Sequence, residues 1–191
     1  MKLSMTFEEL YQHLTSVNSS RENRLKNAEM VLNNINLLPI LMDVLFKVDD
    51  KVSSKASWVL EFVCDENLEV IIPYLDKFTE NMSKVHLDSA VRSIAKICEY
   101  LVKAYYSKQD NSIKKALAPI YKERIIETCF DWMITNRKVA VKAYSMNTLY
   151  LLGQDYDWVH PELIIILKQD FHSNRAGFKA RANHILKKLK K

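Results

Sequence analysis

The chain contains very little of what strands, membrane spans and secretion require. It has only two glycines, Gly153 and Gly177, and four prolines in 191 residues, so the turn residues on which β-hairpins depend are scarce. No apolar run approaches the roughly 20 residues that cross a bilayer, and the opening MKLSMTFEELYQHL contains acids where a secretory signal has an apolar block. These absences argue against a β protein, a membrane protein and a secreted protein, and we expect a cytoplasmic location.

Patterns for metal, redox and phosphate chemistry are also missing. The cysteines Cys64, Cys98 and Cys129 are widely spaced, form no CxxC pair and lie in apolar segments, so we expect buried thiols. The five histidines form no HExxH or HxxxH pair, and there is no Gly-rich phosphate loop or GxSxG elbow. We therefore expect no metal and no cofactor, no small-molecule substrate is evident, and the balance is against an enzyme.

What the chain does contain favours helices. Leu, Lys, Ile, Ala and Val are plentiful, and most of them are compatible with helices, whereas Gly and Pro are not. A chain of 191 residues can bury one sizeable core but not two large independent ones. We predict an all-α fold with a single domain over residues 1–191.

The positive charge is concentrated at the C-terminal end. Seven bases and no acid lie between Arg175 and Lys191, whereas residues 1–174 carry 21 bases against 23 acids. This distribution predicts a local basic patch rather than a nucleic-acid surface along the whole chain. Two interpretations stay open: the patch binds an anionic partner, or its cations are solvated and favour a helix C-terminus. The patch consists of Lys187, Lys188, Lys190 and Lys191.

A short frame recurs, as KVSSKA at 51–56 and as KVAVKA at 138–143. It belongs to a longer repeat, in which a proline near the start of one helical segment is followed by a second amphipathic segment with a base at a fixed phase. The prolines are Pro39, Pro73, Pro119 and Pro161, and the bases are Lys55, Arg92, Lys142 and Lys179, with a weaker early copy at Lys26. Six residues before each base stands a residue that, with the exception of His86, can cap a helix: Ser20, Asp49, His86, Asn136 and Ser173.

The repeat predicts five helix pairs, at about 5–34, 36–67, 68–106, 116–155 and 157–190. The polar stretch 106–114 is interpreted as an insertion or extended connection between pairs. The first helix of a pair carries an apolar face, exemplified by Leu38, Ile40, Leu41, Val44 and Leu45, and by Ile125, Ile126, Cys129, Phe130 and Met133. Because one pair cannot bury such faces alone, neighbouring pairs must stack. We predict a short, right-handed α-solenoid, or α-α superhelix.

The frame Val91-Arg92-Ser-Ile-Ala95, with weaker counterparts at 141–145 and 178–182, resembles the second helix of HEAT or armadillo repeats. The prolines resemble those of the first HEAT helix. The resemblance covers nearly the whole chain. Only Arg92 and Asp49 match the arginine and aspartate from which HEAT arrays build an Asp–Arg ladder between repeats.

This resemblance implies that the second helices line a concave surface, where the bases Lys55, Arg92, Lys142 and Lys179, with Tyr144, could contact a partner. The alternative is that each base is solvated or paired within the chain. The junction before the last pair is rich in carboxylates and aromatics: Asp155, Tyr156, Asp157, Trp158, His160 and Glu162. It is either a site or a structural turn, in which Gly153 ends one helix, Asp157 caps the next and Trp158 closes the core.

Three functions from different classes follow. The leading hypothesis is a non-enzymatic scaffold that binds a protein partner through its concave face or assembles with itself. The first alternative is a nucleic-acid-binding protein, which would resemble the HEAT-like DNA alkylation repair glycosylases. The second is an all-helical lyase of the fumarase and adenylosuccinate lyase kind, which is disfavoured because the sequence lacks their Ser-Ser-x-Met-Pro-x-Lys-x-Asn loop.

Overall fold

The computed structural model describes residues 5–169 and 176–189, and within these ranges it contains helices and no strands. The predicted all-α fold is confirmed. Residue contacts divide the chain into two compact units, Met1–Ile97 (unit 1) and Cys98–Lys191 (unit 2), and the division falls inside one helix. The single domain over 1–191 therefore stays a prediction.

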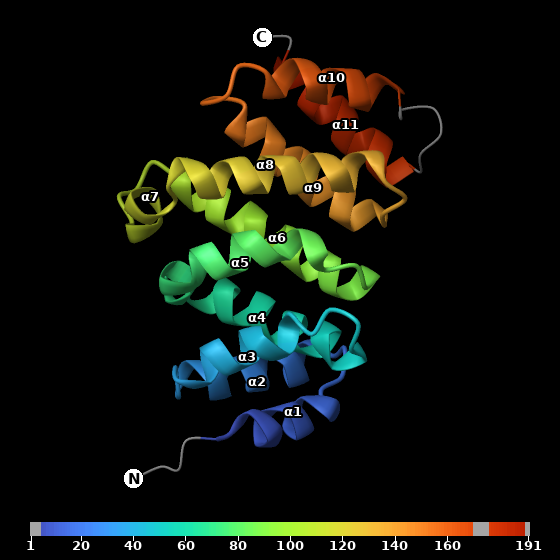
Figure 1. Cartoon of the computed structure of the whole chain (residues 1–191). Coiled ribbons are helices and arrows are strands. Elements are labelled where there is room, and N and C mark those ends of the chain that lie inside the picture. The colour runs from blue at the N-terminus through green and yellow to red at the C-terminus, as the bar shows by residue number, and fades with distance from the viewer. Residues whose placement is uncertain (1–4, 170–175, 190–191) are drawn as a thin grey trace. The chain divides into compact units, whose positions relative to one another are not determined.

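Unit 1 begins with α1 (Phe7–Thr15) and α2 (Arg21–Leu32), followed by α3 (Leu37–Leu45) and α4 (Lys51–Glu66) (Figure 1). A short 3₁₀ segment η1 (Leu68–Tyr74), then α5 (Leu75–Asn81) and η2 (Met82–Lys84), lead into α6 (Asp88–Tyr105), whose first half belongs to this unit. Helix α4 packs against α2 and α3, and α1 packs against α3 and α4. Successive helix pairs are thus stacked, as in an α-solenoid.

Unit 2 contains the second half of α6 and then the short α7 (Ser112–Ala116), which begins in the polar stretch 106–114 that the sequence analysis interprets as an insertion or extended connection. Its main body consists of α8 (Pro119–Ile134), α9 (Val139–Leu152), α10 (Val159–Gln169) and α11 (Ala176–Leu189) (Figure 1). Helix α9 packs against α8, α10 and α11, and α10 also contacts α8. This unit too has stacked helix pairs.

The capping predictions are right at one position and wrong at two. Ser20 caps α2, since its hydroxyl accepts a hydrogen bond from the Asn23 N–H at 3.2 Å. At α4 the cap is Asp50, one residue later than predicted, while Asp49 lies 3.4 Å from the His86 ring. Helix α9 begins after Lys138 with no side-chain cap, so Asn136 does not cap it. Ser173 lies outside the described residues.

Three of the four prolines lie near the start of a helix. Pro119 is the first residue of α8, where its missing N–H costs nothing, and Pro39 and Pro161 are third in α3 and α10. Pro73 differs, because it lies inside η1 and precedes α5. The third predicted pair therefore opens with a 3₁₀ segment rather than with an α-helix.

The core is apolar, as predicted, with two local differences. Leu38, Leu41, Val44 and Leu45 of α3 are fully buried, whereas Ile40 is half-buried, and on α8 Phe130 is half-buried. All three cysteines are buried free thiols, which confirms the prediction. Burial raises the pKa of the Cys129 thiol to about 12 and also raises the pKa of Cys64, so neither forms a thiolate at neutral pH.

Candidate functional site

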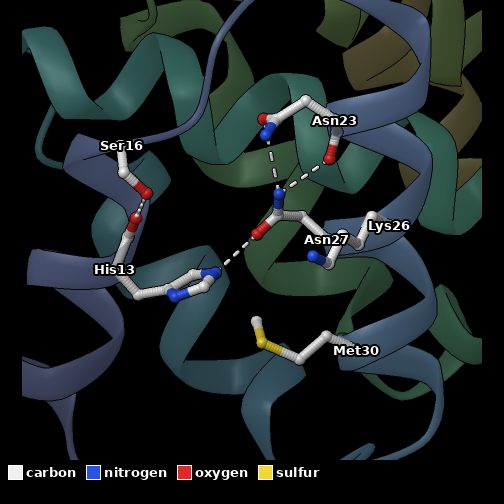
Figure 2. A pocket seen from close by; sticks show the side chains of 6 residues that line it. All are labelled: His13, Ser16, Asn23, Lys26, Asn27 and Met30. Carbon is white, nitrogen blue, oxygen red and sulfur yellow. Dashed lines mark hydrogen bonds between the residues drawn. The ribbon is translucent and has the colours of Figure 1, made fainter.

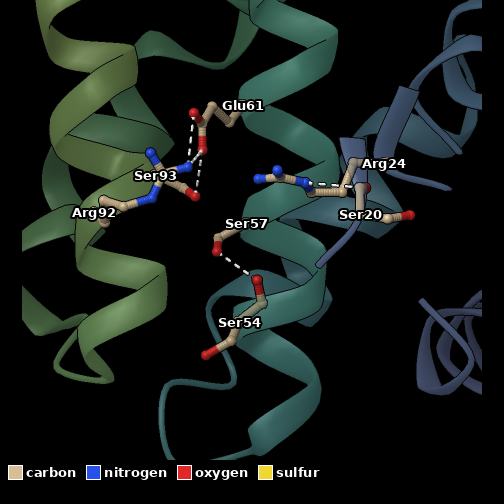
Figure 3. Close-up of polar contacts among 7 residues, drawn as sticks. All are labelled: Ser20, Arg24, Ser54, Ser57, Glu61, Arg92 and Ser93. Atoms are coloured by element: carbon tan, nitrogen blue, oxygen red, sulfur yellow. Dashed lines mark hydrogen bonds and ion pairs between the residues drawn. The ribbon is translucent and has the colours of Figure 1, made fainter. Parts of the chain in front are cut away.

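The second helices of unit 1 share a polar cluster that is centred on a buried carboxylate. Glu61 of α4 accepts hydrogen bonds from Arg92 Nη2 at 3.0 and 2.8 Å, one to each oxygen, and from the Ser93 hydroxyl at 2.7 Å (Figure 3). Both donors come from α6. A carboxylate is tolerated in such a buried position when its lone pairs are paired and hydrogen-bonded. The cluster therefore fixes the Arg92 side chain on the surface of α6.

Helix α2 contributes two arginines to the neighbouring surface. The guanidinium carbons of Arg24 and Arg21 lie 4.8 and 5.6 Å from the ring centroid of Phe62 on α4. Arg24 Nε also donates to the Ser20 carbonyl at 3.3 Å. Figure 3 shows the Arg24 side chain extending from α2 across α4 toward Glu61 and Arg92. Arg24, Glu61 and Arg92 thus form a row across α2, α4 and α6, which we call the inner row.

The predicted contact bases have different environments. Lys55 donates a hydrogen bond to the Thr15 carbonyl at the C-terminal end of α1, and Arg92 belongs to the inner row. Lys142 is buried, with its ammonium 5.8 Å from the Phe178 ring centroid. Tyr144 and Lys179 are half-buried. The structure thus places Lys55 and Arg92 in contacts within unit 1, and Lys142 below the surface of unit 2.

The predicted basic patch is only partly described. Lys187 and Lys188 are exposed on α11, and the Lys188 ammonium lies 5.1 Å from the Tyr150 ring centroid. Lys190 and Lys191 lie outside the described residues.

A second buried glutamate plays a role in unit 2 like that of Glu61 in unit 1. Glu99 of α6 accepts hydrogen bonds from Asn147 of α9 and from Lys103, both at 3.0 Å. In each unit, a buried acid on one second helix is therefore bonded to the second helix of the next pair. These contacts stand where the HEAT resemblance implied an Asp–Arg ladder, since Asp49 contacts His86 and Arg92 contacts Glu61.

Unit 2 also contains a buried base. Lys122 of α8 donates to the Asp155 carboxylate at 2.9 Å and to the Tyr105 hydroxyl at 3.0 Å, and its ammonium lies 4.3 Å from the Tyr105 ring centroid. Burial alone would lower the pKa of Lys122, but the bonds to Tyr105 and Asp155 prevail and raise it. Burial and the nearby Asp155 carboxylate raise the pKa of the Tyr106 hydroxyl. This cluster connects α6, α8 and the turn after α9.

The turn between α9 and α10 is shaped by Gly153 and His160. Gly153 ends α9, as predicted, and a Cβ atom at this position would lie 2.1 Å from His160 Cδ2. The His160 ring packs into that space, stacks on Tyr150 with ring centroids 5.9 Å apart, and has Nε2 2.8 Å from the Tyr150 carbonyl. The prediction that Trp158 closes the core is wrong: its side chain is 52% exposed and stacks on Phe130.

One pocket of unit 1 lies between α1 and α2, with a volume of about 290 Å³ (Figure 2). Asn27 is its best-fixed side chain, because Nδ2 donates to the Asn23 carbonyl at 2.7 Å and Oδ1 lies 2.6 Å from His13 Nε2. Since the amide nitrogen is a donor, the oxygen must accept, and His13 carries its proton on Nε2. Ser16, Lys26 and Met30 complete the lining.

Other features of the described residues bear on the class of protein. No helix among them is long and apolar enough to span a bilayer. Nor do three His, Cys, Asp or Glu side chains meet within residues 5–169 and 176–189 in a way that could hold a metal ion. Stacked helix pairs joined by contacts between second helices define a helical-repeat protein.

Comparison with known proteins makes the class specific. A family model described as HEAT repeat domain matches residues 12–189, which is most of the chain. The chain therefore belongs to the HEAT repeat family. Neither the curated proteins nor the solved structures contain a significant match to it.

Sequence reasoning missed the main members of these clusters. Arg24 follows the cap Ser20 by four residues, and a base one turn into a helix could have indicated a contact residue. The repeat places its base six residues after the cap, however, and this position is Lys26. Glu61 is a charged residue within an apolar segment, which is a signal for a buried pair without a sign of its partner, whereas Lys122 opens the charged run 122–124 and gives no such signal. Their partners Arg92 and Asp155 are 31 and 33 residues away.

Proposed function

We propose that this HEAT repeat domain is a non-enzymatic interaction module that binds a protein partner through the surface of its second helices. HEAT repeats generally mediate protein interactions, and this chain belongs to that family. The proposal includes a cytoplasmic location. In this proposal, the partner is another protein or a second copy of the same chain.

The inner row is the observation that carries the proposal. Arg24, Glu61 and Arg92 come from three successive second helices and are held by hydrogen bonds and by stacking on Phe62. Side chains that are already ordered lose less conformational freedom on binding than free ones do. Arginine and aromatic side chains are also the types that dominate binding energy at protein interfaces. In unit 2, Tyr144 and Lys179 are the proposed contacts.

The test maps where a partner binds. A photo-crosslinking amino acid is placed at Lys96, one turn beyond Arg92 on α6, and in a second variant at Glu80, which is exposed on α5. The tagged full-length protein is irradiated in its source cells, purified and analysed by mass spectrometry. We expect a protein crosslinked specifically through position 96. Crosslinking through position 80 alone, or a protein recovered as an uncrosslinked monomer from both variants, contradicts the proposal.

A further inference from the structure

The arginine pair on α2 has an unusual arrangement for surface residues. Both guanidinium groups lie over one phenylalanine ring, and Phe62 is only 6% exposed. The ring thus serves as a support and the arginines form the surface. Stacking on an aromatic face suits the planar, weakly hydrated guanidinium group and leaves its edges available for hydrogen bonds.

These two charges have no acidic partner within the described part of unit 1. Ion pairs there join Lys77 to Asp43, His86 to Asp49 and Arg92 to Glu61, whereas Arg21 and Arg24 contact the Phe62 ring and Arg24 also contacts the Ser20 carbonyl. The hydrogen bond from Arg24 Nε to the Ser20 carbonyl orients the guanidinium group, whose N–H donors form a planar fork, and leaves both Nη groups free to donate. Two oriented guanidinium groups without acids are complementary to carboxylates.

The neighbouring acids limit what else can bind. Glu61 is already bonded to Arg92 and Ser93, while Asp65 and Glu66 are exposed at the C-terminal end of α4 and Glu22 is exposed on α2. A continuous phosphate backbone would be repelled by these exposed acids. Nor could the nucleobases of a nucleic acid stack on the Phe62 ring, since the two arginines cover it. A peptide carries its carboxylates at discrete positions and avoids both problems.

We propose that Arg21 and Arg24, supported by Phe62, bind carboxylate side chains of an acidic segment in the protein partner. The inference rests on the proposed function and specifies the chemistry of the partner. Binding here uses paired N–H donors on each arginine, so it depends on the shape of the guanidinium group as well as on its charge.

The test uses the full chain and a fluorescein-labelled peptide of about eight residues with two glutamates among glycines and serines (the glutamate peptide), and binding is followed by fluorescence polarisation at low and physiological salt. We expect the double variant Arg21→Gln/Arg24→Gln to weaken binding by about tenfold or more, since a hydrogen bond to a charged group is worth about 1.5–3 kcal/mol. Arg21→Lys/Arg24→Lys keeps the charge but not the fork, and we expect an intermediate loss. Helical content by circular dichroism checks that each variant is folded.

A matched control removes the same charge elsewhere. Lys168 and Arg181 are exposed on α10 and α11 of unit 2, and Lys168→Gln/Arg181→Gln should leave peptide binding within about twofold, since salt screens surface charges that do not contact the peptide. An equal loss in the control, no loss in the lysine variant, or no binding of the glutamate peptide overturns the inference. So does tighter binding of a single-stranded DNA of about 20 nucleotides that depends on the same arginines.

The outcomes also separate this inference from the function on which it rests. If position 96 crosslinks to a partner that binds Arg21→Gln/Arg24→Gln as well as the unmodified protein, the acidic-segment inference is wrong and the interaction module stands. If position 96 crosslinks to no partner while the glutamate peptide still binds through the two arginines, the proposed function fails and the carboxylate site remains.

Discussion

The ion pairs Glu61–Arg92 of unit 1 and Lys122–Asp155 of unit 2 bury opposite charges. In unit 1 the acid is buried, since the Glu61 side chain is 8% exposed and that of its partner Arg92 31%, whereas in unit 2 Lys122 is 8% exposed and Asp155 35%. A buried ion must be paired and hydrogen-bonded, and removing its partner is expensive because the remaining charge is left uncompensated. In each pair the more exposed partner, Arg92 or Asp155, is therefore the one whose removal should lower the free energy of unfolding most.

The units differ in what remains when that residue is lost. Glu61 would keep only the Ser93 hydroxyl, whereas Lys122 would keep the Tyr105 hydroxyl and two rings, at 4.3 Å from the Tyr105 centroid and 5.7 Å from the Tyr156 centroid. Aromatic faces attract cations and not carboxylates. A buried base can thus be supported by side chains that cannot support a buried acid, and unit 2 should tolerate the loss better.

The largest expected effect is that of Arg92→Met in unit 1. The change leaves Glu61 buried with a single neutral donor, and we expect a loss of about 3–5 kcal/mol in the free energy of unfolding. Urea unfolding followed by circular dichroism measures it, and hydrogen exchange by mass spectrometry assigns it to unit 1. Adding Glu61→Leu to the same chain should restore most of the stability; if it does not, the cost lies in packing rather than in the stranded charge.

Asp155→Leu is the matched change in unit 2 and should cost less, about 2–3 kcal/mol. Lys122 keeps its bond to Tyr105 at 3.0 Å and its ring contacts, which offset part of the lost pair. The same urea and hydrogen-exchange measurements apply. A cost equal to or above that of Arg92→Met would contradict the idea that the rings support the buried base.

Gly153→Ala probes the turn that carries Asp155. An added Cβ would lie 2.1 Å from His160 Cδ2, so the ring must move and lose its bond to the Tyr150 carbonyl, and overpacking of this kind costs about 1–3 kcal/mol. Gly177→Ala is the control, because there the added Cβ meets Val139 at an ordinary 3.5 Å. We expect that variant to be neutral or stabilised by up to about 1 kcal/mol. Thermal unfolding compares the two alanine variants directly.

Ser93→Ala and Tyr105→Phe each remove one neutral hydroxyl from a buried charge. A hydrogen bond to a charged group contributes about 1.5–3 kcal/mol, and we expect about 1.5 kcal/mol for Ser93→Ala. Tyr105→Phe should cost less, because the ring remains beside Lys122. Unfolding in urea gives both values, and equal costs would remove this difference between the units.

The smallest expected effect is on pH dependence and is specific to unit 2. Burial would raise the pKa of Asp155, but the bond from Lys122 prevails and lowers it, so its contribution to stability is present above about pH 4 and is lost as the pH falls through the lowered value. The raised pKa of Lys122 gives stability that is present below about pH 10.4 and lost above the raised value. Lys122→Met/Asp155→Leu should therefore flatten the profile of unfolding free energy against pH at both ends. An unchanged profile would show that the pair carries no linked protons.

The sequence was sufficient for the helices because their signals are local. Apolar spacing, the cap at Ser20 and the proline at Pro119 each act within a few residues of the helix that they define. The sequence pattern predicts Asp49 as the cap of α4, whereas the cap is Asp50. Helix-start patterns do not distinguish positions that differ by one residue. Pro73 was assigned to an α-helix because a 3₁₀ segment shares the same apolar composition.

The clusters could not be predicted for a different reason. The repeat pattern specifies where Lys55 and Lys142 stand within their helices. Whether such a base lies on the surface or is buried depends on the neighbouring helix pair that packs against it. Lys142 is buried beside Phe178, and Phe178 is more than thirty residues away along the chain. No pattern within one repeat specifies that contact.

The three buried thiols have a practical consequence. Cys64 lies in unit 1, while Cys98 and Cys129 lie in unit 2, and a thiol that is shielded from solvent reacts slowly with alkylating reagents. Alkylation in the native protein therefore has to wait for the surrounding helices to open. Brief exposure to iodoacetamide, followed by peptide mass spectrometry, would give the alkylation rate of each cysteine in the unmodified chain. These rates report how often each unit opens.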